Sequence, residues 1–150
     1  MTEKIYFTRL GMRKYLDDII KMEDELKKLY ERLAYIAEVG GDQYHDNFSY
    51  EQQMNEIHMK DDYLSKMKKQ LINFEVFDPI GNADYVRIGA KVTIEKDNKE
   101  ETWEVVGFGE SDPENGKIAY NSPLAKSLMG KEEGDEITFK TFNICIINIE

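Results

Sequence analysis

The sequence is poor in the residues that build disulfide or metal frameworks. It contains one cysteine, Cys145, and two histidines among 150 residues. A single cysteine excludes an internal disulfide, and no paired Cys-x-x-Cys motif occurs. Because Cys145 lies in an alternating apolar run over residues 142–147, we expect it to be a buried strand residue rather than a catalytic thiol.

Long apolar runs are absent as well. No stretch approaches the ~20 apolar residues that cross a bilayer, and the amino terminus has no apolar core of a signal peptide. The sequence also lacks a Walker loop, a dinucleotide-binding glycine fingerprint and a catalytic-triad arrangement. We therefore expect a cytoplasmic protein with no membrane partner, and one that is not an independent enzyme.

The charge is strongly acidic. The chain carries 20 basic and 30 acidic side chains, which gives a formal net charge of −10. Such a charge repels nucleic acid unless a local basic face outweighs it. The protein can still act on nucleic acid if a larger basic partner supplies the binding and its own carboxylates serve a metal ion.

The amino-terminal part has the pattern of a coiled coil. Its apolar residues alternate in spacing between three and four, which is a heptad seam, over Met12, Tyr15, Ile19, Met22, Leu26, Leu29, Leu33 and Ile36. This spacing predicts a helix over about 11–39. The pattern stops at Gly40 and Gly41, which favour helix-ending conformations.

A second, weaker apolar series follows this break. Its members are Tyr50, Met54, Ile57, Leu64, Met67, Leu71 and Phe74, and the expected seam position near Lys60 is polar. Two helices of similar length joined by a short connection predict an antiparallel hairpin. We assign this hairpin domain to residues 1–77, with an acidic tip at 41–47.

Beyond residue 77 the apolar period changes to two. Strands are predicted over 86–95, 102–108, 117–120, 137–142 and 144–149, with a turn at 97–99. Ser122 suits a helix N-cap and Pro123 the first helical position, so 123–129 should be a short helix ending before Gly130. The chain is thus predicted to be α+β, and 78–150 to be a small antiparallel β domain with one short helix.

The motifs carry a family resemblance. The segment 121–135, Asn-Ser-Pro-Leu-Ala-Lys-Ser-Leu-Met-Gly-Lys-Glu-Glu-Gly-Asp, resembles the Gre family (GreA/GreB-like) of bacterial transcription elongation and transcript cleavage factors. Three further stretches agree in order and spacing: 8–11 opening the hairpin, 41–42 at its tip and 88–92 opening the sheet. Together these matches cover essentially the whole chain.

The resemblance implies a fold and a partner. The carboxy-terminal domain is expected to be FKBP-like, and to dock on the rim of the secondary channel of RNA polymerase through Asn121, Ser122 and Pro123. The coiled-coil hairpin is expected to reach the active centre and the nascent RNA 3′ end. A monomer is expected.

The resemblance also implies a role for the tip. Acidic residues there help the polymerase hold its second Mg²⁺ and cleave a backtracked transcript, which assigns Asp42 and Asp46 as catalytic and metal-ligating residues. The Mg²⁺ belongs to the polymerase active site and is not expected to bind the free protein stably. This role agrees with metal chemistry, because Mg²⁺ is often held by only one or two protein carboxylates.

The tip departs from the family pattern Gly-Asp-x-x-Glu-Asn-x-x-Tyr. Three residues separate Asp42 from Asp46 instead of two, and Asp46 is one methylene shorter than the family glutamate. Tyr44, His45 and Phe48 are candidates for RNA or channel contact, or alternatively exposed or packed tip residues.

Three functions remain open from the sequence. The first is a cleavage-stimulating factor, and the second is a Gre-like regulator or inhibitor that occupies the same channel without promoting cleavage. The third is a coiled-coil adaptor or an FKBP-like isomerase. Only the tip distinguishes the first two, whereas failure to bind polymerase would favour the third.

Overall fold

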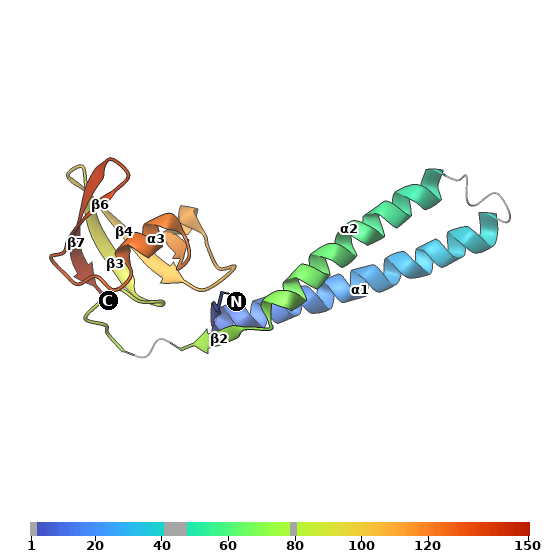
Figure 1. The fold of residues 1–150 in the computed structure, drawn as a ribbon, viewed down its shortest axis with the longest axis horizontal. Coiled ribbons are helices and arrows are strands. Elements are labelled where there is room, and N and C mark those ends of the chain that lie inside the picture. Colours follow the sequence, from blue (N-terminus) through green and yellow to red (C-terminus); the bar gives the residue numbers. More distant parts are fainter. Residues whose placement is uncertain (1–2, 41–47, 79–80) are drawn as a thin grey trace. The chain divides into compact units, whose positions relative to one another are not determined.

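The structure is a computed structural model that describes residues 3–40, 48–78 and 81–150. Its contacts divide the chain into two compact units. The sheet unit comprises Met1–Arg13 and Phe74–Glu150, and the hairpin unit comprises Lys14–Asn73. These bounds differ from the predicted 1–77 and 78–150, because both ends of the hairpin segment belong to the sheet unit. Figure 1 shows the fold and labels the three α-helices and most of the strands.

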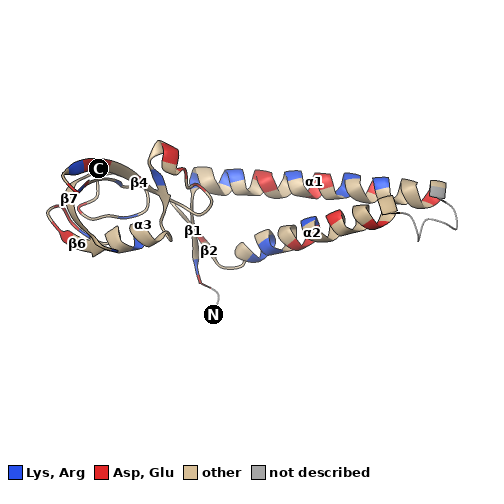
Figure 2. Ribbon diagram, turned by 90° about the horizontal axis from the view of Figure 1, so that it is seen from above, with Lys and Arg blue, Asp and Glu red and all other residues tan. Residues whose placement is uncertain are grey.

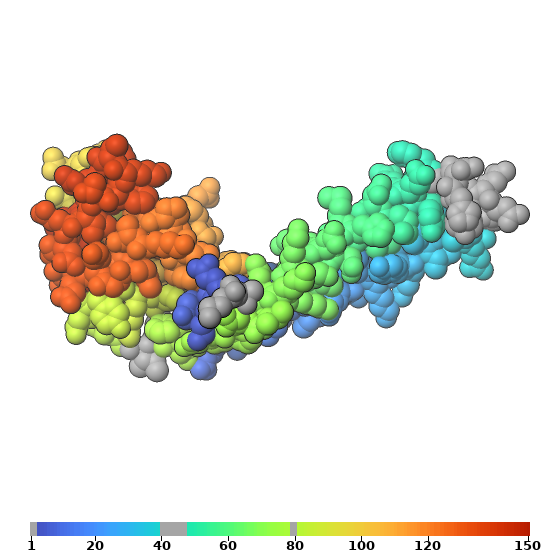
Figure 3. All heavy atoms as spheres, in the orientation of Figure 1, coloured from blue at the N-terminus to red at the C-terminus, as the bar shows by residue number. Residues whose placement is uncertain are grey.

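Two antiparallel helices, α1 (Arg9–Gly40) and α2 (Phe48–Gln70), form the hairpin as predicted. Their ribbons run side by side in Figure 1, and their side chains meet along the helices in Figure 3. The buried core of this unit consists of Ile19, Leu26, Ile57, Leu64 and Met67. The heptad seam read from α1 therefore identifies the packed face. Among the described residues, no helix has the length and apolarity to cross a membrane.

The seam of α2 differs from the prediction at two positions. Gln53 is the buried residue in the first turns, whereas the predicted seam residue Met54 is only half-buried. Phe74 was assigned to the same helical series, but α2 ends at Gln70 and Phe74 begins strand β2 (Phe74–Phe77). The period of the apolar residues does not show where a helix ends, so the series was extended one turn too far.

Charged residues of both signs are interspersed along both helices (Figure 2). Among the described residues, two ion pairs connect the helices, Lys60 with Glu25 at 2.8 Å and Lys68 with Glu23 at 2.6 Å. The buried apolar side chains carry more of the stability, because exposed ion pairs contribute only about 0–1 kcal/mol each.

The sheet unit contains a five-stranded sheet in the order β5-β4-β3-β7-β6. The strands are β3 (Lys91–Lys96), β4 (Lys99–Val106), β5 (Lys117–Ala119), β6 (Glu136–Phe139) and β7 (Phe142–Ile149). Asp97 and Asn98 have φ of 52° and 57°, and form the predicted turn between β3 and β4. The short helix α3 (Pro123–Leu128) places Ala125 and Leu128 in the core of the sheet.

The predicted strand over 86–95 is interrupted. Val86, Ile88 and Ala90 are buried as the alternation indicated, but β3 begins only at Lys91. Gly89 has φ of 90°, and its N–H donates to Val105 O at 2.7 Å, so the chain turns there before entering the sheet. The alternation predicted burial correctly but could not reveal this turn, which a left-handed glycine permits.

The sheet is not wholly antiparallel. β5 runs parallel to β4, with Val105 opposite Ile118, whereas the other neighbouring pairs are antiparallel. A parallel pair cannot be joined by a tight hairpin. The chain makes the crossover through residues 107–116, which include the 3-10 helix η2 (Pro113–Asn115). This crossover carries Glu110, whose role is described below.

A second sheet, which sequence analysis missed, pairs β1 (Ile5–Thr8) in parallel with β2. Phe7 of β1 is fully buried and packs edge-on against Phe74 and Phe108, at ring-centre distances of 6.2 and 5.7 Å. The entire α1–α2 segment forms the crossover between these two strands. Four-residue strands so far apart in sequence leave no local pairing signal, because no turn connects them.

Candidate functional site

The predicted tip residues fall outside the part of the chain that the structure describes. These are Asp42, Tyr44, His45 and Asp46. Phe48 is described as the first residue of α2, where its side chain is 77% exposed. Within residues 3–40, 48–78 and 81–150, no group of three or more His, Cys, Asp or Glu side chains could hold a metal ion. The assignment of Asp42 and Asp46 as metal ligands therefore stays a prediction.

The predicted docking residues Asn121, Ser122 and Pro123 lie together at the start of α3. Ser122 is the N-cap, with extended backbone at φ −67° and ψ 152°, and its Oγ accepts a hydrogen bond from Ala125 N at 3.2 Å. Pro123 occupies the first helical position, where its missing N–H has no intrahelical partner to lose. The sequence thus folds locally as its capping residues predict.

The three docking residues differ in what they present to a partner. Asn121 and Pro123 are exposed, and so is Lys126 one turn further along α3. Ser122 is half-buried and its hydroxyl is used within the fold. Asn121 and Pro123 are therefore the side chains available for contact, and Ser122 holds the loop that displays them.

The remainder of the 121–135 motif is explained by the turns after α3. Gly130 and Gly134 have φ of 75° and 87°, and their N–H groups donate to Val86 O and Ile146 O, both at 2.8 Å. Only glycine adopts this backbone region without strain. The Glu133 carboxylate accepts a hydrogen bond from Ile149 N at 2.8 Å. The motif thus fixes the loop after α3 against the sheet.

Tyr120, beside the predicted docking residues, makes long-range contacts that the sequence did not predict. Its hydroxyl accepts a hydrogen bond from Tyr6 N at 3.2 Å, and its ring packs edge-on against Tyr6 with centres 5.5 Å apart. Tyr120 immediately precedes Asn121, so the predicted docking loop begins at a residue that contacts β1. Both tyrosines were visible in the sequence, but nothing local pairs residues 114 positions apart.

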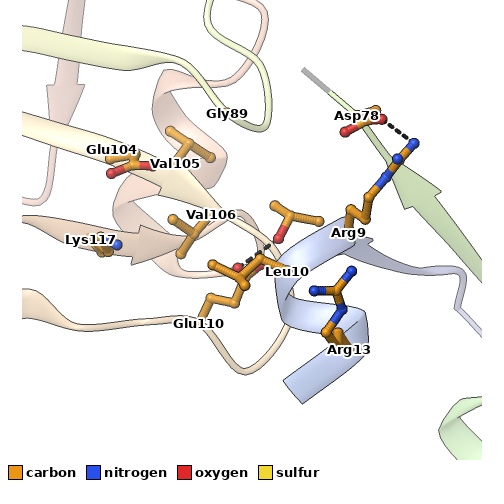
Figure 4. Close-up of a pocket in the computed structure, with 11 residues that line it drawn as sticks. Arg9, Leu10, Arg13, Asp78, Gly89, Glu104, Val105, Val106, Glu110 and Lys117 are labelled. Atoms are coloured by element: carbon orange, nitrogen blue, oxygen red, sulfur yellow. Dashed lines mark hydrogen bonds and ion pairs between the residues drawn. The ribbon is translucent and has the colours of Figure 1, made fainter. Parts of the chain in front are cut away.

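A pocket of about 410 Å³ lies in the same unit, beside the first turn of α1. Figure 4 shows its lining side chains, among them Arg9, Arg13, Glu104, Glu110 and Lys117. Arg9 forms an ion pair with Asp78 at 2.5 Å. None of these residues was predicted as a functional residue. Charges of both signs line the pocket, so it does not favour an anion or a cation by net charge alone.

The architecture is that of a helical hairpin inserted between two strands of a sheet unit with an exposed, capped loop. The model of the family described as "Transcription elongation factor, GreA/GreB, C-term" matches residues 81–150. Transcription elongation factor GreA of Cereibacter sphaeroides is 37% identical over 145 residues, covering 93% of this chain and 90% of that protein. The GreA of Bacillus licheniformis is 32% identical over 144 residues, with the same coverage.

These similarities define the class. The chain belongs to the GreA/GreB family of transcription elongation factors. Among solved structures, the crystal structure of Thermus aquaticus Gfh1 is 19% identical, covers 99% of each chain and gives a TM-score of 0.49.

Proposed function

We propose that the protein binds RNA polymerase at its secondary channel and stimulates the polymerase's own Mg²⁺-dependent cleavage of backtracked nascent RNA. The observation that carries this proposal is 37% identity to a GreA over 93% of the chain, a span that includes both the hairpin and the sheet unit. Family factors act with RNA polymerase in elongation. The proposal extends this role to cleavage.

The two units have separate tasks in this proposal. The sheet unit docks on the polymerase through the exposed Asn121 and Pro123, held by the Ser122 cap. The hairpin enters the channel and brings its tip to the nascent RNA 3′ end. A net charge of −10 supports docking on the polymerase rather than direct binding to RNA, because RNA repels an acidic protein and the polymerase must bring the two together.

The tip contributes carboxylates rather than a complete active site. Asp42 and Asp46 would supply oxygen ligands to a Mg²⁺ of the polymerase, which supplies the other ligands and the substrate. Mg²⁺ favours such hard oxygen ligands. The protein would therefore stimulate a reaction of its partner and would not hydrolyse RNA by itself.

A second function has one observation in its favour. The tip has three residues between Asp42 and Asp46, and the second acid is an aspartate. A ligand displaced by one residue can fail to reach the metal. A factor that occupies the channel without promoting cleavage is therefore the competing proposal.

The two proposals are separated with stalled, backtracked elongation complexes containing end-labelled RNA. Purified protein and Mg²⁺ should release short 3′ cleavage products, and Asp42→Asn should abolish this release while leaving polymerase affinity unchanged. Asp61→Asn, an exposed acid on α2, serves as the charge-matched control. Binding without cleavage by the unmodified protein would favour the competing proposal, and absence of binding would reject both.

A further inference from the structure

The Glu110 side chain joins the crossover loop of the sheet to the start of α1. Its Oε1 accepts a hydrogen bond from the Thr8 hydroxyl at 2.6 Å, and its Oε2 accepts one from Gly107 N at 3.0 Å. The Thr8 hydroxyl oxygen in turn accepts from Gly11 N at 3.0 Å. Figure 4 shows Glu110 directed at the first turn of α1. We call Thr8, Gly11, Gly107 and Glu110 the Glu110 clamp.

The clamp differs from a capping box, in which the acid accepts from the backbone N–H of the N-cap, because Glu110 accepts from the Thr8 hydroxyl and from Gly107 N. In a capping box an N-cap Ser or Thr is followed three residues later by Glu or Gln. Here Thr8 is the N-cap of α1, but the third position after it is Gly11. The carboxylate comes instead from Glu110, 102 positions away from Thr8.

Two glycines make room for this carboxylate. A Cβ at Gly11 would lie 2.4 Å from Glu110 Cδ, and a Cβ at Gly107 would lie 2.6 Å from Glu110 Oε2 and 2.7 Å from Thr8 N. Such distances are far below van der Waals contact. Thr8, Gly11, Gly107 and Glu110 therefore form one arrangement in which a side chain at either glycine would displace the acid.

Further hydrogen bonds attach β1 to the same region. Phe108 N donates to Tyr6 O at 2.8 Å, and Tyr6 N donates to Tyr120 OH at 3.2 Å. Beside the clamp, the pocket of about 410 Å³ is lined by Arg9, Leu10 and Arg13 of the first turn of α1. These polar contacts add to the packing of Phe7 against Phe108 in attaching this part of the chain to the sheet.

We infer that Glu110 is a positioning residue, which fixes the first turn of α1 to the sheet unit so that docking of this unit directs the hairpin. This inference rests on the proposed function, in which the sheet unit docks and the hairpin tip acts. The carboxylate is suited to the role because hydrogen bonds to an ionised acceptor are strong and because negative charge is favoured at a helix amino terminus.

The clamp itself is tested in the free, full-length protein by a double-mutant cycle. Gly11→Ala should lower the thermal midpoint, because the new methyl group meets Glu110. In the Glu110→Ala background the same substitution should raise the midpoint, because alanine favours helix more than glycine. Amide hydrogen exchange at Gly11 and Gly107 should be faster in Glu110→Ala. If the two substitutions change the thermal midpoint additively, or if the exchange rates at Gly11 and Gly107 are unchanged, Glu110 does not form the clamp.

Positioning is then separated from general stability in elongation complexes. Glu110→Ala should keep its polymerase affinity within about twofold but lose roughly tenfold or more of cleavage stimulation, since misplacement of a reacting group is costly. Glu110→Gln can still accept from Gly107 N and donate to Thr8 Oγ1, so it should recover part of the activity. Glu101→Ala is the control. It removes a carboxylate that accepts a hydrogen bond from Trp103 Nε1 in the same unit, and it should leave polymerase affinity and cleavage stimulation unchanged.

The outcomes distinguish this inference from the proposed function. If affinity and cleavage fall in parallel in Glu110→Ala, Glu110 supports the fold and not the positioning of the hairpin. If the unmodified protein binds but does not cleave, the proposed function fails while the cycle and the exchange rates still decide the clamp. Positioning is then measured by how strongly the protein inhibits elongation. Glu110→Ala should inhibit less than the unmodified protein at equal polymerase occupancy, and unchanged inhibition would reject the positioning role of Glu110.

Discussion

Lys60 Nζ lies 2.8 Å from Glu25 Oε2, so a lysine at a seam position of α2 reaches across the hairpin to α1. The hydrogen bond to Glu25 raises the pKa of Lys60 above its ordinary value. Lys60 is half-buried, and seven residues earlier the seam carries Gln53. Lys60 and Gln53 are therefore both polar residues on the packed face of α2, and they differ in whether their polar atoms have hydrogen-bond partners among the described residues.

Gln53 is the less satisfied of the two. It is 5% exposed, and its Nε2 has no hydrogen-bond partner among the described residues. A buried donor without a partner costs about 1–3 kcal/mol, so Gln53→Leu should raise the free energy of unfolding by roughly that amount. Urea denaturation of the full-length chain measures this change. Gln52→Leu, at an exposed neighbouring position, is the control. An equal gain in the free energy of unfolding from both variants would show that the unpartnered Gln53 amide is not the cause.

The packed face should dominate hairpin stability over the charged faces. Leu26 is 5% exposed, so Leu26→Asp should cost at least the roughly 2–5 kcal/mol lost when a buried leucine is truncated. Lys28 pairs with Asp24 at 2.6 Å on the exposed face of α1, and Lys28→Ala should barely change the thermal midpoint. Thermal unfolding followed by circular dichroism compares the two. Equal destabilisation would mean that the helical register is wrong.

The hairpin was predictable because its signal is local and repeated. Successive heptads in α1 each select the same face, and in α2 the single polar position at Lys60 weakens the series without obscuring it. The strands of the sheet were predictable in the same way, since alternation marks buried residues. Alternation does not show whether neighbouring strands run parallel or antiparallel. The sheet was therefore predicted to be antiparallel, although β5 runs parallel to β4.

The missed features depend on contacts between distant residues. Thr8 caps α1, but the third residue after it is Gly11 rather than the acid of a capping box, and this local pattern does not point to an acid elsewhere in the chain. Nothing in the sequence selects Glu110 among 30 acidic residues for that role. The start of α3 was predictable because Ser122 and Pro123 act on their own neighbours, whereas the contact between Tyr120 and Tyr6 was not.

Docking and folding should separate within the loop at the start of α3. Ser122→Ala removes the cap of α3 and should cost about 1 kcal/mol of stability, because the hydrogen bond from Ala125 N is lost. Asn121→Arg changes an exposed side chain and should weaken polymerase affinity without changing the thermal midpoint. Thr141→Arg, exposed in the turn between β6 and β7, makes the same charge change as a control. Equal weakening by both arginine variants would reject Asn121 as a docking residue.

Tyr15 should make hairpin stability depend on alkaline pH. Its hydroxyl donates to Met67 O at 3.2 Å and to the Gln70 side chain, and burial raises its pKa. Because the pKa of Tyr15 is higher in the folded than in the unfolded state, the protonated hydroxyl stabilises the fold. This contribution to stability is fully present below the unfolded pKa, about 10, and is lost as the pH rises through the pKa of the folded state. Urea denaturation at pH 8 and at strongly alkaline pH should show a smaller loss for Tyr15→Phe than for the unmodified protein.

The control for this pH effect is Tyr35→Phe. Tyr35 lies on the same helix but is 65% exposed, so its removal should leave the alkaline loss of stability unchanged. If Tyr15→Phe and the unmodified protein lose the same stability between the two pH values, the alkaline transition belongs to other groups.

In the proposed function the tip determines whether the factor promotes cleavage or only occupies the channel, and its departure from the family pattern can be reversed. Deleting His45 restores the family spacing between Asp42 and Asp46, and Asp46→Glu restores the longer side chain. Because both changes bring the second carboxylate nearer to the family arrangement, the combined variant should cleave backtracked RNA at least as well as the unmodified protein. Release of 3′ products at equal polymerase occupancy is the measurement.

The same variant also tests the competing proposal. Cleavage gained only by the combined variant would mean that the extra residue marks a factor that occupies the channel without catalysing. If both proteins bind and neither cleaves, Asp42 and Asp46 are not the missing metal ligands, because restored spacing and reach would have supplied them. Asp42→Asn in the combined variant is the matched control, since it keeps the shape of the side chain and removes the charge that Mg²⁺ requires.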